Sequence, residues 1–211
     1  FAALKDDGSV VTWGHPDLGG NSDLLTQEDD DNKIVKIYSN ALSFAALKNN
    51  GEVVTWGHPD FGGDSSSVST ELTDIVEIYS TTLTYAALSS SGKVVTWGNH
   101  PNNYSIPLDI EDHLTPNDDN KIVKIYSSYI SFIAVKNDNK TIIKWGLDID
   151  EGIHTFSKDI KYIYSNRNSF VILFEDNSIQ VFGNGNDDDW GGVGSQGVDF
   201  NGFSMDINAI N

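Results

Sequence analysis

The segment Phe44-Ala-Ala-Leu-Lys-Asn-Asn-Gly-Glu-Val-Val-Thr-Trp-Gly57 decides the fold, because versions of it recur along the whole chain. The segment holds two signatures, Phe-Ala-Ala-Leu-Lys at its start and Val-Val-Thr-Trp-Gly at its end. A third signature, Ile-Tyr-Ser, precedes it at Ile37–Ser39 and returns before the later copies. Three signatures in a fixed order, at a period of about 40 residues, indicate a repeat array. The copies begin at Phe1, Phe44, Tyr85, Phe132 and Phe170 and end at Gly14, Gly57, Gly98, Gly146 and Gly183.

Each copy has the composition of a β-hairpin. Segments such as Glu52–Trp56 and Thr141–Trp145 are β-branched and aromatic, which is typical of strands. Between the two halves lies a pair of residues that tolerates positive φ, and such pairs predict two-residue type I′ turns. No segment combines a 3.6-residue apolar period with helix caps, so we expect a nearly all-β protein. The turn pairs are Asp7-Gly8, Asn50-Gly51, Ser91-Gly92, Asp138-Asn139 and Asp176-Asn177.

The apolar run Phe44-Ala-Ala-Leu47 distinguishes between β architectures. Four successive apolar residues indicate a strand that is buried on both faces. Blades of a propeller meet this condition because each one is covered by its neighbours, whereas a two-sheet sandwich leaves one face wet. The prediction is a β-propeller with four-stranded blades, with one aromatic per blade packed in the core. These aromatics are Trp13, Trp56, Trp97 and Trp145, with Phe182 in the fifth copy.

The ordered signatures, together with Trp-Gly-His-Pro-Asp-x-Gly-Gly at 13–20 and 56–63, resemble the repeats of RCC1-like (regulator of chromosome condensation) β-propellers. The resemblance covers almost the whole chain and implies the propeller fold. Some members of that family are guanine-nucleotide exchange factors for small GTPases, and the fold can also inhibit enzymes. The resemblance therefore implies exchange and enzyme inhibition as two alternatives to simple protein binding.

The repeats divide the chain into one propeller domain, 1–211, of about five blades. The approximate units are 1–43, 44–84, 85–131, 132–169 and 170–211. Phe203–Ile210 has the pattern of a further strand, and we expect it to complete the first unit and close the ring, which removes sheet edges. The alternative is that the chain is a fragment of a seven-bladed propeller.

The charge of the chain limits its partners. With 13 Lys+Arg, 31 Asp+Glu and a formal charge of −18, it should repel nucleic acid and anionic membrane surfaces. The same charge favours a basic protein partner. No apolar run approaches the roughly 18 residues of a membrane-spanning helix.

Neither metal nor catalytic chemistry has a clear signature. The acidic clusters Glu28–Asp31, Asp118–Asp119 and Asp187–Asp189 offer oxygen ligands for calcium, but adjacent carboxylates point apart on an extended chain. We therefore expect these clusters to be solvated loops and expect no cofactor. A Gly-x-Ser-x-Gly elbow is absent from the sequence, and so are cysteines, so the prediction is a protein that is not an enzyme.

The loops after the Trp-Gly strands are the candidate binding site. Repetition places them on one rim of the ring, where divergent loops on a rigid scaffold typically carry recognition. Their aromatic residues are candidate anchors for a protein partner, since interface centres are rich in aromatics. The alternative is that these residues fold back onto their own blade. The candidate residues are His15, Asp17, His58, Asp60, Phe61, Tyr104 and Trp190.

Overall fold

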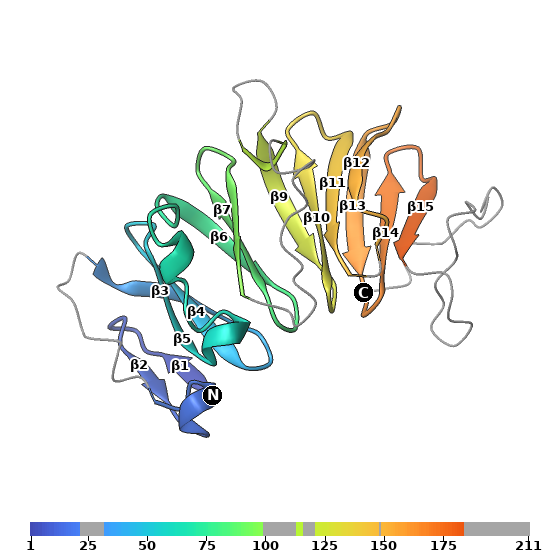
Figure 1. The fold of residues 1–211 in the computed structure, drawn as a ribbon. Coiled ribbons are helices and arrows are strands. Elements are labelled where there is room, and N and C mark those ends of the chain that lie inside the picture. The colour runs from blue at the N-terminus through green and yellow to red at the C-terminus, as the bar shows by residue number, and fades with distance from the viewer. Residues whose placement is uncertain (22–31, 99–112, 116–120, 148, 184–211) are drawn as a thin grey trace.

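The computed structural model describes residues 1–21, 32–98, 113–115, 121–147 and 149–183. These residues form antiparallel sheets and short 3-10 helices, and the five sheets follow one another along a curved row (Figure 1). This arrangement confirms the predicted all-β propeller of about five blades. The strand that we expected to close the ring, 203–210, lies outside the described residues, and the first and fifth sheets lie at opposite ends of the row.

Each sheet contains one Phe-Ala-Ala-Leu strand and its Trp-Gly strand, and the second to fifth sheets also include the Ile-Tyr-Ser strand that comes before them, so these sheets begin a few residues before the approximate unit bounds. The first sheet contains β1 (Ala2–Leu4) and β2 (Val10–Thr12). The second contains β3 (Ile34–Ser39), β4 (Ser43–Lys48) and β5 (Val53–Gly57), and the third contains β6 (Ile75–Ser80), β7 (Tyr85–Ser89) and β8 (Val94–Trp97). The fourth contains β9 (Ile122–Ser127), β10 (Ser131–Lys136), β11 (Thr141–Gly146) and β12 (Gly152–Thr155). The fifth contains β13 (Ile160–Ser165), β14 (Ser169–Phe174) and β15 (Ile179–Gly183).

The strands occupy equivalent places in successive sheets. The Ile-Tyr-Ser strands β3, β6, β9 and β13 contact one another from sheet to sheet, and we call them inner strands. The Phe-Ala-Ala-Leu strands are the middle strands, and the Trp-Gly strands are the outer strands.

A fourth strand is described only in the fourth sheet, where β12 pairs with β11. The expectation of four-stranded blades is wrong for the second unit, where β5 is followed by the 3-10 helices η3 (Pro59–Phe61) and η4 (Ser66–Val68). Pro59 has no backbone N–H to donate to a sheet and its φ suits a helical turn, which explains the difference.

The hairpin turns differ from the predicted type I′. Only the second residue of each pair has positive φ, as in Gly51 at 84° and Asn139 at 56°. In the second unit Gly51 N donates to Lys48 O at 3.0 Å and Lys48 N donates to Glu52 O at 2.9 Å. These bonds define a three-residue loop that ends in a left-handed residue. The first residue of each pair lacks a positive φ, and in the second unit its side chain supports the turn, because Asn50 Oδ1 accepts the Glu52 backbone N–H at 3.0 Å.

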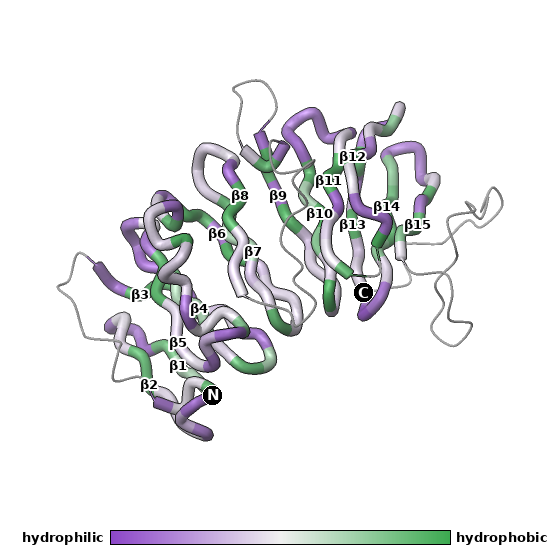
Figure 2. Tube along the Cα trace, in the orientation of Figure 1, coloured by the Kyte–Doolittle hydropathy of each residue, from purple (hydrophilic) through white to green (hydrophobic). Residues whose placement is uncertain are grey.

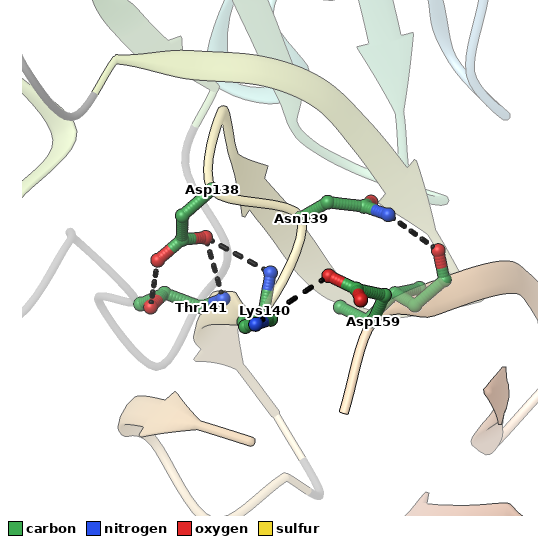
Figure 3. Close-up of polar contacts among 6 residues, drawn as sticks. Asp138, Asn139, Lys140, Thr141 and Asp159 are labelled. Carbon is green, nitrogen blue, oxygen red and sulfur yellow. Dashed lines mark hydrogen bonds and ion pairs between the residues drawn. The ribbon is translucent and has the colours of Figure 1, made fainter. Parts of the chain in front are cut away.

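These turns also join neighbouring blades. In the fourth unit Asp138 Oδ1 accepts the Lys140 and Thr141 backbone N–H groups at 2.9 and 2.8 Å (Figure 3). The next residue, Asn139, contacts the fifth sheet, because its Nδ2 donates to Ile160 O at 2.7 Å and its carbonyl accepts Ile160 N at 2.8 Å. In the second unit Gly51 O likewise accepts Ile75 N at 3.0 Å, so both of these turns close their own sheet and contact the next one.

The middle strands form the core. Ala45 and Ala46 are fully buried and Leu47 is 6% exposed, which confirms that this strand is covered on both faces. Apolar clusters fill the spaces between the second and third, third and fourth, and fourth and fifth sheets. Figure 2 shows apolar residues along the strands and polar residues at the turns.

A stacked aromatic pair spans the middle and outer strands of most blades. Phe44 and Trp56 stack at 5.2 Å, and Tyr85 and Trp97 stack at 5.0 Å. Trp56, Trp97 and Trp145 are at most 5% exposed, which confirms their predicted place in the core. The prediction is wrong for Trp13, which is 50% exposed because its sheet ends the row.

A glycine of the preceding unit covers each of two pairs. Trp56 Nε1 donates to Gly19 O at 3.2 Å, and Trp97 Nε1 donates to Gly62 O at 3.1 Å. A Cβ at Gly62 would lie 2.7 Å from the Tyr85 ring, and its φ of 94° also disfavours other residues. The turn therefore fits the next blade only with glycine at this position.

Substitution of this glycine tests the packing. Gly62→Ala should lower the free energy of unfolding by about 1–3 kcal/mol more than Gly152→Ala, because it adds a clash to the backbone strain. Gly152 is the matched control: its φ is 130°, and nothing lies within 4 Å of a Cβ placed there. Denaturant unfolding measures both variants, and equal losses would contradict the role given to the Tyr85 contact.

A polar bridge also links the second and third sheets. Glu77 Oε1 accepts hydrogen bonds from Lys36 Nζ at 2.6 Å and from Tyr38 OH at 2.7 Å. Burial opposes ionisation of Glu77, but these two bonds outweigh it and hold the pKa of the carboxyl below its ordinary value of 4.5. Burial and the bond to Glu77 raise the pKa of Tyr38.

The lowered pKa predicts a pH-dependent contribution to stability. The folded state binds the Glu77 proton less tightly than the unfolded state, so the contribution is present above pH 4.5 and is lost as pH falls through the folded pKa. Glu77→Gln should remove it, at a cost below about 1 kcal/mol because Lys36 is half-exposed. Urea unfolding from pH 7 to pH 3 measures the difference, which should shrink at low pH, and Glu175→Gln serves as an exposed control.

Candidate functional site

The turns after the outer strands and the turns between inner and middle strands meet at one end of the sheets. In the second unit Asn40 Nδ2 and Ser43 Oγ both donate to Phe61 O at 2.7 Å, which joins the two kinds of turn. We call this end of the sheets the turn rim. It comprises the outer turns 15–20 and 58–63 and the inner turns 40–42, 81–83, 128–130 and 166–168.

Each outer turn begins at a His-Pro pair and winds into one 3-10 turn. In η1 (Pro16–Leu18) the His15 carbonyl accepts Leu18 N at 3.1 Å and Gly20 N at 2.9 Å. The carbonyl of His58 accepts Phe61 N and Gly63 N with the same geometry in η3. Proline at the first helical position suits this turn because its φ is fixed near the helical value.

The described candidate residues divide by exposure. His15, Asp17 and Asp60 are exposed, whereas His58 and Phe61 are half-buried with their rings 4.7 Å apart. The outer turns therefore point one acidic group each into solvent, while Phe61 lies partly against its own turn. Tyr104 and Trp190 lie outside the described residues. The binding role of all seven candidates stays a prediction.

A buried polar network holds the rim in place. Asn40 Oδ1 accepts the backbone N–H groups of Leu42 and Ser43, both at 2.8 Å. Tyr85, from the next blade, donates its OH to Ser43 O at 2.8 Å and accepts Asn40 N at 3.1 Å. Burial raises the pKa of Tyr85, so its phenol remains a neutral donor.

The inner turns form a chain of backbone hydrogen bonds from blade to blade. Ala41 N donates to Thr82 O at 3.0 Å, Thr82 N to Tyr129 O at 2.8 Å, and Tyr129 N to Arg167 O at 3.1 Å. These four residues therefore stand in a row on the turn rim. The backbone is fixed along the row, and only the side chains differ.

Two residues of this row were missed by the sequence analysis. Tyr129 is 42% exposed, and the guanidinium carbon of Arg167 lies 4.4 Å from the centre of its ring. Tyrosine and arginine are the residue types that most often anchor protein interfaces. The sequence does carry a signal at this position, because it varies while its surroundings repeat. Two residues after the serine of each Ile-Tyr-Ser signature the chain has, in turn, Ala41, Thr82, Tyr129 and Arg167.

The junction of the fourth and fifth sheets is built differently. Lys144 stands where the first three copies have Thr12, Thr55 and Thr96, and its Nζ lies 4.5 Å from the ring centre of Phe182. Burial lowers the pKa of Lys144, and burial together with the nearby Lys144 lowers that of His154. The equivalent aromatics of the second and third sheets, Trp56 and Trp97, instead donate their N–H to a glycine carbonyl, whereas Phe182 receives this cation–π contact.

Metal-binding and membrane-spanning features are both lacking in the part of the chain that the structure describes. Within those ranges, no group of three or more His, Asp or Glu side chains is arranged to hold a metal ion. The acidic clusters considered for calcium lie outside those ranges. None of the described helices is long and apolar enough to cross a membrane.

The charge of the chain is divided unevenly. Just over half of the 31 acidic residues and none of the 13 basic residues fall in segments 22–31, 99–112, 116–120, 148 and 184–211. Most of these segments come after a Trp-Gly strand and before the next Ile-Tyr-Ser strand in the order of the chain. The strands and short turns are therefore nearly balanced in charge, and the excess negative charge belongs to the connecting segments.

Comparison with known proteins identifies the fold and no closer relation. No family model matches the chain, and no curated protein matches it. Among solved structures, yeast RCC1 (Prp20) bound to Kap60 is 19% identical with a TM-score of 0.55, covering 86% of this chain and 53% of that one. A second structure, of Prp20p from Saccharomyces cerevisiae, is 20% identical with a TM-score of 0.53, covering 86% of this chain and 54% of that one. Human WBSCR16 is 17% identical with a TM-score of 0.54, covering 82% and 55%.

These similarities establish a β-propeller fold. The chain spans about half the length of each of these three solved structures. At such identities the likeness shows architecture only, because unrelated functions share propeller scaffolds.

The buried network predicts the cost of removing one hydroxyl. Tyr85→Phe should lower the free energy of unfolding by about 1–2 kcal/mol, because Ser43 O loses a buried donor. The ring itself fits, since the other units have phenylalanine at this position. Thermal and urea unfolding measure the loss, with Tyr162→Phe as a control at an exposed tyrosine. An unchanged midpoint for Tyr85→Phe would show that the network does not stabilise the rim.

Proposed function

We propose that this protein is a non-enzymatic interaction module of the RCC1-like propeller type that binds a basic protein at its turn rim. The RCC1-like assignment is supported by the ordered repeat signatures and by the structural likeness to Prp20. The remaining support comes from the charge of the connecting segments and the side chains of the rim.

The uneven charge is the observation that carries the proposal. Nearly all of the formal charge of −18 lies in the connecting segments, which carry 16 acidic residues and no basic one. Concentrated negative charge accelerates encounter with a basic partner and disfavours acidic ones. The exposed carboxylates Asp17 and Asp60 add to it on the outer turns.

The rim also offers anchors for a partner. Tyr129 and Arg167 are exposed neighbours on backbone that is fixed by inter-blade hydrogen bonds. Binding does not have to order this backbone, because the inter-blade hydrogen bonds already hold it. Phe61, Tyr104 and Trp190 are the aromatic candidates that the sequence adds on the neighbouring outer loops.

Histones are a suitable first probe because they are basic proteins. The structure of Prp20p is described together with its binding to Gsp1p and histones, and another Prp20 structure contains Kap60. These partners belong to Prp20, and they suggest the probe without assigning it as the partner of this chain.

Binding to immobilised core histones at rising salt tests the proposal. Asp188→Asn with Asp189→Asn should weaken binding several-fold at low salt and reduce its salt dependence, because two charges leave the acidic surface. Asp6→Asn with Glu175→Gln, which removes two scaffold charges, should change binding much less. Tyr129→Ala should weaken binding by roughly tenfold, as loss of an interface anchor does. Tyr162→Ala is the control for an exposed tyrosine away from the rim.

The remaining outcomes discriminate between the alternatives. Equal loss of binding in the scaffold variants would contradict a localised acidic surface. Absence of histone binding, together with affinity capture that returns no basic protein, would overturn the proposal. Accelerated release of fluorescent nucleotide from small GTPases would instead support exchange, and inhibition of a captured enzyme would support the inhibitor alternative.

A further inference from the structure

Lys144 is a buried lysine whose charged group lacks a polar partner in the described part of the chain. It lies on β11, and 5% of the residue is exposed. Its Nζ lies over the Phe182 ring and forms no hydrogen bond or ion pair with a described residue. An ammonium group has three N–H donors, and leaving them unpaired in a protein interior is costly. The Nζ is not one of the fully buried, unpartnered polar atoms of the described residues, so the amine reaches solvent.

Threonines occupy the equivalent position in other units and have polar partners. Thr12 Oγ1 donates to Gly20 O at 3.2 Å, and Thr55 Oγ1 donates to Ser65 Oγ at 3.1 Å. In these units the side chain joins its strand to the segment that follows. In the fourth unit β12 follows and pairs with β11 through the backbone, so Lys144 is not required for that link.

Space beside Lys144 gives a reagent access to the amine. The cross-strand partner of Lys144 on β12 is Gly152, which has no side chain. Paired residues of neighbouring strands point to the same face of a sheet, so a side chain at Gly152 would lie beside that of Lys144. Nothing lies within 4 Å of a Cβ placed on Gly152. The glycine therefore leaves one side of the lysine uncovered.

The surroundings of Lys144 favour the neutral amine. Burial lowers the pKa of Lys144, and the nearby carboxylate of Asp150 partly opposes this change. On β12, the pKa of His154 is lowered by burial and by the charge of Lys144. A lower pKa leaves a larger fraction of the lysine as free amine at neutral pH, and a lysine desolvated in an apolar site is a typical activated nucleophile.

We propose that Lys144 is a site of covalent acylation by small acyl thioesters. The neutral amine adds to the thioester carbonyl carbon, a C–N bond forms, and the C–S bond breaks. The sulfur leaves as a thiolate and takes up the proton that the nitrogen loses, so the products are an amide and a thiol and nothing is oxidised or reduced. The amide is uncharged, so acylation removes the ammonium group that this junction holds without a polar partner. This inference is independent of the proposed partner of the turn rim.

Acetylation by S-acetyl-N-acetylcysteamine tests the proposal on the complete chain, with peptide mass spectrometry reporting the rate at each lysine. At pH 7.5 Lys144 should react at least several-fold faster than the exposed lysines Lys5 and Lys124. Its rate should also level off at a lower pH than theirs, because its free amine forms at lower pH. In the urea-unfolded chain the three rates should be equal. Reaction of Lys144 at the same rate as Lys5 and Lys124 in the folded protein, or more slowly, would overturn the proposal.

Two further measurements test the surroundings of the amine. Asp150→Asn should speed acetylation of Lys144 at pH 7, because it removes the charge that favours the ammonium form, whereas Glu175→Gln should leave the rate unchanged. Acetylation should raise the pKa of His154, measured by NMR titration, because the charge beside the imidazole is lost. Lys144→Thr should raise it in the same way. An acetylation rate that Asp150→Asn leaves unchanged, or a pKa of His154 that acetylation of Lys144 leaves unchanged, would contradict the site described.

Discussion

The hydrogen bond from a buried indole N–H to a glycine carbonyl of the preceding unit is the contact on which the row of blades depends. It satisfies the polar atom of a large apolar side chain at the centre of the interface, as a buried tryptophan requires. It also forces a glycine into the turn, because the same approach brings the backbone against the stacked ring. The Trp-Gly strand of one unit and the Pro-Asp-x-Gly-Gly turn of the preceding unit therefore supply the two halves of one contact, which is made between units rather than within them.

This contact also shapes the surface that is left for binding. The outer turns direct their glycines inward, so their exposed groups are the side chains between the histidine and the glycines. The inner turns are tied together through their backbones, so variation there is confined to side chains such as those of Tyr129 and Arg167. A rim fixed in this way presents different chemistry from blade to blade without altering the scaffold.

The fourth and fifth blades show that the contact can be exchanged for another. Phe182 has no N–H, and Lys144 places its ammonium group over the Phe182 ring. Both changes occur together at one junction, and β12 adds a strand beside them. Burial of the lysine lowers its pKa, so this junction retains a cation at some electrostatic cost that the tryptophan junctions avoid.

The sequence by itself determined the repeat, the β class, the middle strands buried on both faces and the uneven charge, because these depend on composition and period. It did not determine the hairpin type, since Asn50 and Asp138 hold their turns right-handed through their own side chains. It also placed Trp13 in the core, and only the order of the sheets in space shows that this face is open. Tyr129 and Arg167 were overlooked for the same reason: their turns are far apart in the chain, and only packing between blades puts them side by side. Local patterns fix what each unit is, whereas contacts between units decide which of its residues are covered.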